Sequence, residues 1–299
     1  MERNRRIAII GAGVVGTSFG YLLRKTGWRI AGIASRTLQS AQKAKKIIGE
    51  GTASADLIKT AREADIVFIT TSDDAIKGTC EKIADGGGFK PGTIIFHTCG
   101  ALSSDILKSA KRKGAYTASL HPLQSFANVK EAVKNLQGSY FSIEGNENAL
   151  SVAQHIISDL KGKKITLQPK KKSLYHAGAS VASNFLVATI GFGLALFHAA
   201  GIRKEDSLKA LMPLIKGTVR NVELLGIPAA LTGPISRGDA GIVEGHLKAI
   251  AKRQKEMIRL YSELGRYTVA IAQEKGTLGK RDAHVIISLF DNAQKGLNI

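Results

Sequence analysis

Residues 7 to 16, read I-A-I-I-G-A-G-V-V-G, constrain the fold more than any other stretch of the sequence. Residues 7 to 10 form a short apolar run that suits a strand buried on both faces, and Gly11, Gly13 and Gly16 follow it at G-x-G-x-x-G spacing. The first glycine permits a tight strand-to-helix turn, the second lets the backbone approach a pyrophosphate, and the third lets helix and strand pack closely. The stretch therefore predicts a dinucleotide site at a helix start, where the dipole favours anions.

The residues after the glycines complete a strand-helix-strand unit. Residues 14 to 25 continue at helical spacing, Gly27 ends that helix, and residues 28 to 34 (W-R-I-A-G-I-A) form a second strand. This context supports a motif that is weak when it stands alone. The predicted phosphate contacts are Gly11, Gly13, Val14, Val15 and Gly16.

The choice of cofactor depends on the residues after the second strand. An NAD enzyme usually carries Asp or Glu there to hold the ribose hydroxyls, but this sequence has Ser35, Arg36 and Thr37. An arginine between two hydroxyls suits a 2′-phosphate, because the guanidinium grips phosphate through a fork of donors. These residues predict NADP; the alternative is a polar turn that caps the following helix.

Three later strands also end in polar loops. Residues 66 to 70 (I-V-F-I-T), 93 to 96 and 115 to 120 are the strands, and loops beyond the ends of parallel strands face the cofactor crevice. For His97 and Cys99 the alternative is a structural role, as polar side chains that fill space at the end of a strand. Cys99 would be a nucleophile only if a general base lay beside it. The predicted cofactor contacts are Thr71, Ser72, Asp73, His97, Thr98 and Cys99, and the predicted substrate contacts are His121, Gln124 and Ser125.

Residues 173 to 202 contain no Asp, Glu, Lys or Arg. Such a length would suit a membrane span. We favour a core helix, because polar side chains fall in one half of the run, no second span accompanies it, and a nucleotide domain precedes it. A charge-free run of this length also predicts a homodimer formed through the C-terminal half, since one modest helical domain could hardly surround it.

His176, Ser180 and Asn184 lie four residues apart in this run. They drift only about 80° around an α-helix and share a face, with Lys172 near the edge of that face. A polar stripe on an apolar helix needs partners, and a substrate carbonyl would supply them. Lys172, His176, Ser180 and Asn184 are therefore the predicted catalytic residues; a network satisfied within the core is the alternative.

A loop dense in glycine and polar residues, L-T-G-P-I-S-R-G-D, occupies residues 231 to 239 and precedes a helix predicted over residues 240 to 264. Arg237 is placed to clamp a substrate carboxylate, or else to pair with Asp239. Ser236, Arg237, Asp239 and His246 complete the predicted substrate contacts.

Length and composition give the wider expectations. A chain of 299 residues predicts two domains, residues 1–168 and 169–299. The net charge of +19 favours acidic ligands, but the basic residues are scattered and do not predict a specific nucleic-acid site. The two cysteines have no metal-ligand spacing, so we expect no metal and a reducing, cytoplasmic location.

The sequence resembles the Rossmann-like family that carries the domain of unknown function 2520 behind its nucleotide domain. The resemblance rests on G-A-G-V-V-G, H-T-C-G-A-L-S, H-P-L-Q-S-F, Y-H-A-G-A-S-V-A-S-N and L-T-G-P-I-S-R-G-D. More distantly, the chain is similar to 6-phosphogluconate dehydrogenase, pyrroline-5-carboxylate reductase and ketopantoate reductase. The resemblance implies an α/β Rossmann domain, then an all-α domain that commonly dimerises, with the active site between them.

The resemblance also implies an activity. Ketopantoate reductases carry Lys, Asn and Asn at four-residue intervals, where this chain has His176, Ser180 and Asn184, so Asn184 is the direct match. The proton donor is then His176 or Lys172. We expect an NADPH-dependent reductase of a small 2-oxo acid, with 2-oxopantoate of the pantothenate pathway as the best guess. The alternatives are an imine reductase of the pyrroline-5-carboxylate type and a noncatalytic NADP-binding sensor or assembly protein.

Overall fold

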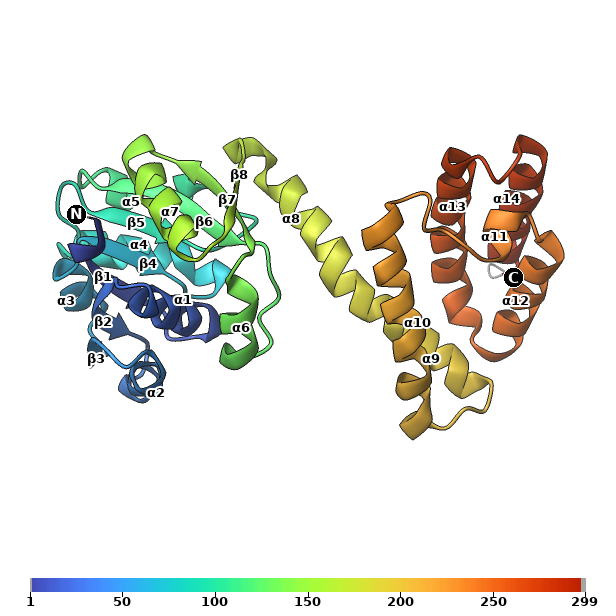
Figure 1. Ribbon diagram of the computed structural model, residues 1–299, viewed down its shortest axis with the longest axis horizontal. Helices are drawn as coiled ribbons and strands as arrows, with labels where there is room; N and C mark the ends of the chain where they lie inside the picture. Colours follow the sequence, from blue (N-terminus) through green and yellow to red (C-terminus); the bar gives the residue numbers. More distant parts are fainter. Residues whose placement is uncertain (1, 297–299) are drawn as a thin grey trace. The chain divides into compact units, whose positions relative to one another are not determined.

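A computed structural model of the chain describes residues 2–296 and forms two compact units, Met1–Phe185 and Leu186–Ile299 (Figure 1). The first unit is an α/β domain and the second is all-α, so the predicted fold class is confirmed. The predicted domain boundary at 168/169 lies just after the last strand. The first unit extends further, through the start of the long helical run.

The first unit contains one eight-stranded sheet in the order β3-β2-β1-β4-β5-β6-β7-β8. Every neighbouring pair is parallel except β6 and β7, which are antiparallel. The strands are β1 (Arg6–Ile10), β2 (Arg29–Ala34), β3 (Thr52–Ser54), β4 (Ile66–Ile69), β5 (Ile94–His97), β6 (Tyr116–Pro122), β7 (Tyr140–Gly145) and β8 (Lys163–Thr166). The carboxyl ends of β1, β2, β4, β5 and β6 therefore lie along one edge of the sheet.

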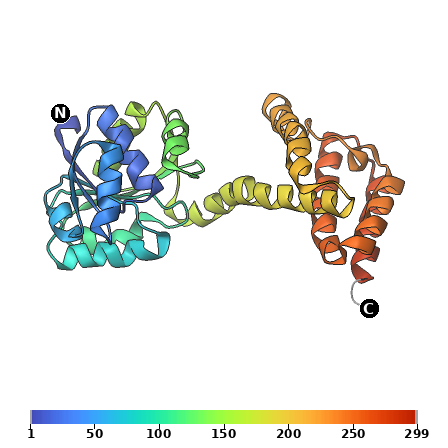
Figure 2. The same cartoon turned by 90° about the horizontal axis from the view of Figure 1, so that it is seen from below.

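Helices cover both faces of this sheet (Figures 1 and 2). Alternate residues of each central strand enter different cores: Ile7 and Ile9 of β1 pack on one side, and Ala8 and Ile10 on the other. Burial on both faces explains the continuous apolar runs of the sequence. One face carries α1 (Val14–Lys25), α2 (Leu38–Ile48), α6 (Val129–Leu136) and α7 (Glu147–Asp159); the other carries α3 (Leu57–Arg62), α4 (Ile76–Asp85) and α5 (Lys108–Lys111).

A continuous helical run links the first unit to the second. It consists of α8 (Lys172–Ser180), a π-helical turn (Val181–Phe185) and α9 (Leu186–Ala199). Among the described residues, Pro169–Ala199 is the one helix long and apolar enough to cross a membrane, with a mean hydropathy of 1.8. Only 6% of this window is buried, and α9 has no buried residue, so the core helix that the sequence favours is not found within the single chain. One helix of this kind is weak evidence for a membrane span.

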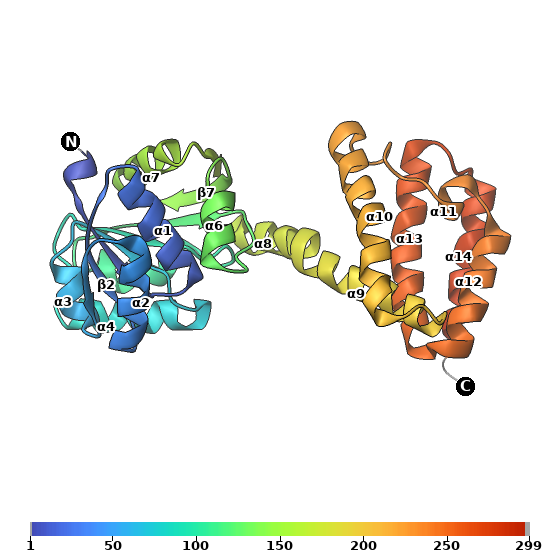
Figure 3. The same ribbon diagram turned by 60° about the horizontal axis from the view of Figure 1, so that its bottom comes forward.

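The second unit is a helical bundle (Figure 3). Its core joins residues of α12, α13 and α14, among them Val243, Val269 and Phe290. The helices are α9, α10 (Lys204–Leu225), α11 (Pro234–Arg237), α12 (Ala240–Arg253), α13 (Ile258–Lys275) and α14 (Lys280–Lys295).

The single helix predicted over residues 240 to 264 is wrong. The chain leaves helical geometry at Gln254 (φ −148°, ψ 56°), and α13 begins at Ile258. The break lets Ile250 and Ile258 enter the same core from two helices. Tertiary packing outweighs helix propensity here.

Candidate functional site

The three glycines of the first turn play different roles in the structure. Gly11 has a φ of +116°, and a Cβ there would lie 2.6 Å from the carbonyl carbon of Thr70. A Cβ on Gly16 would lie 2.1 Å from the carbonyl oxygen of Gly11, whereas one on Gly13 would meet no atom within 4 Å. The first and third glycines thus allow close packing, and the second leaves open space in front of the turn.

Helix α1 begins directly after this open position. Its N-cap is Gly13, and no side chain caps the first N–H groups. Free N–H groups and the positive end of a helix dipole form an anion site. The turn therefore fits a dinucleotide pyrophosphate, with Val14 and Val15 in the first helical turn.

The loops after β2 and β4 lie close together. The pKa of Asp74 is lowered, first by a hydrogen bond from Ser72 and also by the positive charge of Arg36. Thr37 is the N-cap of α2 and accepts a hydrogen bond from the Ser40 N–H at 3.3 Å. The capping alternative thus holds for Thr37, and Ser35 and Arg36 stay predicted contacts for a 2′-phosphate. Ser35, Thr71 and Asp73 stand in these same two loops.

His97 is part of the core of the first unit. Its side chain has no exposed surface, and its Nδ1 accepts a hydrogen bond from the Cys99 N–H at 3.2 Å. Burial lowers the pKa of His97 to about 3, so the ring is neutral. His97 braces the loop with Thr98 and Cys99, and a role as a direct cofactor contact does not fit its burial.

Cys99 is 4% exposed, and burial raises the pKa of its thiol. A thiol that stays protonated is a weak nucleophile. The structure therefore gives no support to nucleophilic catalysis by Cys99.

Lys172 also lies inside the first unit rather than at an open site. It is 1% exposed, and its Nζ donates a hydrogen bond to Ser119 Oγ at 2.6 Å. Burial lowers the pKa of Lys172, while the carboxylate of Glu144 acts in the opposite direction. Glu144 is itself held by the N–H and hydroxyl of Ser104, at 2.7 and 2.8 Å. Lys172 thus belongs to a buried charged network.

A cavity of about 640 Å³ gathers six of the predicted residues: His121, Gln124, Ser125, His176, Ser180 and Asn184. His121, Gln124 and Ser125 reach it from β6 and the loop that follows, while the helical run supplies the predicted stripe. The residues lining it are His121, Leu123, Gln124, Ser125, Phe126, Tyr175, His176, Gly178, Ala179, Ser180, Ala182, Ser183 and Asn184. The predicted face formed by His176, Ser180 and Asn184 therefore opens onto one space.

The helix that carries His176, Ser180 and Asn184 is not a regular α-helix along its whole length, so its residues are not all separated by about 100° of rotation. Residues 181 to 185 form the π-helical turn, which holds Asn184. Turns of this kind occur frequently at functional sites. The turn changes the phase of the helix, yet all three stripe residues still line the cavity.

Two residues of this cavity region escaped the sequence analysis. The hydroxyl of Tyr175 lies 3.1 Å from Nδ1 of His121, with the two rings edge to face. A Cβ on Gly100 would lie 2.6 Å from Cδ2 of His176 and 2.8 Å from Nε2 of His121, so a larger residue there would require these rings to move. Both stand within quoted motifs, Y-H-A-G and T-C-G, but their partners are remote in sequence.

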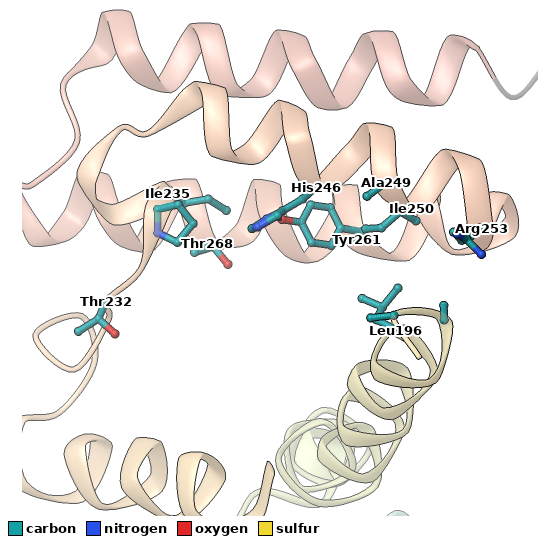
Figure 4. A pocket seen from close by; sticks show the side chains of 12 residues that line it. Leu196, Thr232, Ile235, His246, Ala249, Ile250, Arg253, Tyr261 and Thr268 are labelled. Atoms are coloured by element: carbon teal, nitrogen blue, oxygen red, sulfur yellow. The ribbon is translucent and has the colours of Figure 1, made fainter. Parts of the chain in front are cut away.

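The predicted substrate residues of the second unit make contacts within that unit. Arg237 pairs with Asp239 at 2.8 Å, as the alternative for this loop states, and Ser236 Oγ lies 3.0 Å from Thr277 Oγ1. His246 Nδ1 lies 2.8 Å from the Tyr261 hydroxyl, in the wall of an apolar cavity of about 700 Å³ (Figure 4). Their roles as substrate contacts stay predictions.

Two family models match the chain, one for each part. Residues 2–122 match a Rossmann-like domain, and residues 139–268 match the domain of unknown function 2520. No curated protein matches the sequence. Among the described residues, no group of three His, Cys, Asp or Glu side chains is placed to hold a metal ion.

Solved structures share this fold over most of its length. A presumed NADP oxidoreductase from Bacteroides fragilis is 23% identical, with a TM-score of 0.75 over 90% of this chain and 100% of its own. A protein from Thermotoga maritima is 26% identical, with a TM-score of 0.72 over 90% and 99%. A pyrroline-5-carboxylate reductase from Coxiella burnetii is 14% identical, with a TM-score of 0.58 over 98% of each chain.

Proposed function

The chain belongs to the family that joins a Rossmann-like domain to the domain of unknown function 2520, and from this premise we propose that it is an NADPH-dependent reductase. The observation that carries the proposal is that the glycine turn after β1 and the polar cavity after β6 lie at the same edge of one sheet. This edge is where dinucleotides and their substrates bind in open α/β folds.

The residues present fit the cofactor. Gly11, Gly13 and Gly16 with the start of α1 would hold the pyrophosphate, and Arg36 would hold the 2′-phosphate. Bound NADPH supplies a hydride from C4 of its nicotinamide.

The substrate we propose is a small 2-oxo acid, with 2-oxopantoate as the specific candidate. Ser180 and Asn184 line the cavity and would orient the reacting carbonyl through hydrogen bonds. Arg237, the last residue of α11, is proposed to hold the carboxylate, which requires it to exchange its present partner, Asp239.

The experiment that tests the proposal follows NADPH absorbance at 340 nm, with purified protein and a panel of 2-oxo acids. We expect oxidation of NADPH with 2-oxopantoate or a close analogue, and a large loss of activity in Arg237→Ala. Tight NADPH binding without oxidation by any oxo acid or imine would favour the sensor alternative.

A second candidate is an imine reductase. No Lys or Arg lines the 640 Å³ cavity of the first unit, and Leu123, Phe126 and Ala182 form apolar parts of its wall. A cavity without a cationic side chain suits a neutral or cationic imine better than a carboxylate. Oxidation of NADPH by cyclic imines, but not by oxo acids, would support this candidate.

We propose further that the protein acts in the cytoplasm as a homodimer. The absence of Asp, Glu, Lys and Arg from residues 173 to 202 supports the homodimer, since such a run needs a large apolar environment. The free thiols of Cys80 and Cys99 fit a reducing cytoplasm. No nucleic-acid partner or metal enters the proposed mechanism.

A further inference from the structure

We infer that Tyr175, hydrogen-bonded to His121, is the residue that gives a proton to the substrate atom reduced in this cavity. The inference rests on the proposed reductase function, which requires such a proton. Of the two donors that the sequence suggests, Lys172 does not line this cavity, whereas His176 lines it together with Tyr175.

The geometry brings the two side chains together from distant parts of the chain. His121 stands near the end of β6 and Tyr175 in the second turn of α8, and both line the cavity. Nδ1 of His121 and the Tyr175 hydroxyl are 3.1 Å apart, within hydrogen-bonding distance. The absence of a side chain on Gly100 leaves room for the His121 ring beside them.

Lys172 is badly placed for the same task. Its Nζ is engaged with Ser119 Oγ at 2.6 Å, its side chain is 1% exposed, and it does not line the cavity. A general acid must lie within hydrogen-bonding reach of the atom that it protonates. Tyr175 lines the cavity, where a substrate can approach it, and Lys172 does not.

Reduction of a carbonyl in this cavity takes up one hydride and one proton. The carbonyl carbon gains a hydride, and the electron pair of the C=O π bond moves to the oxygen. That oxygen takes the proton of the Tyr175 hydroxyl, whose O–H bond breaks. The phenolate oxygen takes the proton from Nδ1 of His121, and Nε2 of His121 takes one from solvent, which leaves the neutral Nε2–H tautomer. Proton exchange with solvent then returns the ring to the resting Nδ1–H tautomer before the next turnover.

The charge states of the pair agree with this order of transfer. Burial raises the pKa of Tyr175, partly offset by the Ser142 hydroxyl, so the phenol keeps its proton at neutral pH. Burial, then the charges of Lys172 and His176, lower the pKa of His121 to about 4, so the imidazole is neutral. A neutral imidazole can release one proton and accept another at its second nitrogen.

The test compares Tyr175→Phe, which keeps the ring and removes the hydroxyl, with Tyr140→Phe at a tyrosine 45% exposed on β7. We expect kcat to fall about 10²–10³-fold in Tyr175→Phe, within the range for a positioned acid, with NADPH affinity retained. Tyr140→Phe should leave both unchanged. Equal kcat in wild type and Tyr175→Phe would overturn the inference while the reductase function stands.

A second measurement does not depend on turnover. Nitrogen-15 NMR of the His121 ring should show the Nδ1–H tautomer in wild type, because Nδ1 donates to Tyr175. In Tyr175→Phe the ring should change to the Nε2–H tautomer. An Nε2–H tautomer in wild type would overturn the inference, because Tyr175 would then donate to His121. Absence of turnover in wild type with every oxo acid and imine would overturn the reductase function and the inference together.

Discussion

His97 couples the stability of the first unit to pH. Its pKa is about 3 in the folded protein against 6.5 for an ordinary histidine, so the unfolded chain binds more protons as the pH falls below 6.5. The stability present at neutral pH is therefore lost toward acid, by about 2 kcal/mol at pH 5 from this residue alone.

The variant His97→Asn should remove this dependence. Asn offers an oxygen acceptor to the Cys99 N–H and does not titrate. Urea unfolding at pH 7 and pH 5, followed by the fluorescence of Trp28, should show a smaller acid loss in His97→Asn than in wild type. Trp28 is the sole tryptophan and is buried in the first unit, so it reports that unit. The exposed His155→Asn is the control, and an unchanged acid loss in His97→Asn would contradict the assignment.

Substitution of Arg36 tests whether the protein prefers NADPH to NADH. Arg36→Ala should weaken NADPH binding by about 1.5–3 kcal/mol, the scale of a hydrogen bond to a charged group, and leave NADH binding almost unchanged. Calorimetric titration with both dinucleotides measures the difference. Thr37→Val is the matched comparison, because the Thr37 hydroxyl is engaged as the cap of α2. Equal losses for NADPH and NADH in Arg36→Ala would exclude a contact with the 2′-phosphate.

At the scale of elements, the contact between α13 and α14 depends on one glycine. A Cβ on Gly265 would lie 2.3 Å from Cζ of Phe290, which is fully buried in the core of the second unit. Gly265→Ala should therefore destabilise that unit by about 1–3 kcal/mol, the usual cost of overpacking.

Gly245→Ala in α12 is the control, since a Cβ there meets no atom within 4 Å. In a helix interior this change should be neutral or stabilising, by up to about 1 kcal/mol. Thermal unfolding measured by circular dichroism distinguishes the two variants. Equal melting temperatures for Gly265→Ala and wild type would show that the helices can separate at no cost.

The helical run of α8 and the π-helical turn carries His176, Ser180 and Asn184, the predicted stripe. Substitution of Asn184 tests whether this stripe acts in catalysis. Asn184→Ala should depress kcat while NADPH affinity persists, because the phosphates bind at the turn after β1. Steady-state kinetics and a direct NADPH titration separate the two effects. Loss of NADPH affinity with unchanged kcat would assign Asn184 to the cofactor instead.

At the scale of the whole molecule, the charge-free run predicts assembly. We expect a dimer in sedimentation velocity at micromolar concentration, formed through the C-terminal half. Leu186→Glu places a charge on a side chain of α9 that is 41% exposed within the chain, and it should shift the protein toward monomer. Glu205→Gln at the exposed start of α10 is the control, and a wild-type monomer would contradict the prediction.

The elements whose signals are local could be predicted from the sequence. Strands β1, β2, β4 and β5 follow from apolar runs, and the turn after β1 follows from the spacing of Gly11, Gly13 and Gly16, because backbone sterics act between neighbours. The short strand β3 was not predicted, since its residues, T-A-S, form no apolar run. The stripe of His176, Ser180 and Asn184 was also predictable, since helical periodicity places these residues together.

The tertiary structure alone decided the features that depend on distant partners. Packing between elements far apart in sequence places Lys172 against Ser119 and not at a cavity. Such packing also brings Tyr175 to His121 and breaks the helix at Gln254. Local propensities differ by less than about 1 kcal/mol per residue, whereas burying a large apolar side chain contributes about 1.5–3 kcal/mol. Packing therefore outweighs local preference at these positions, and the pattern of a single sequence does not contain those contacts.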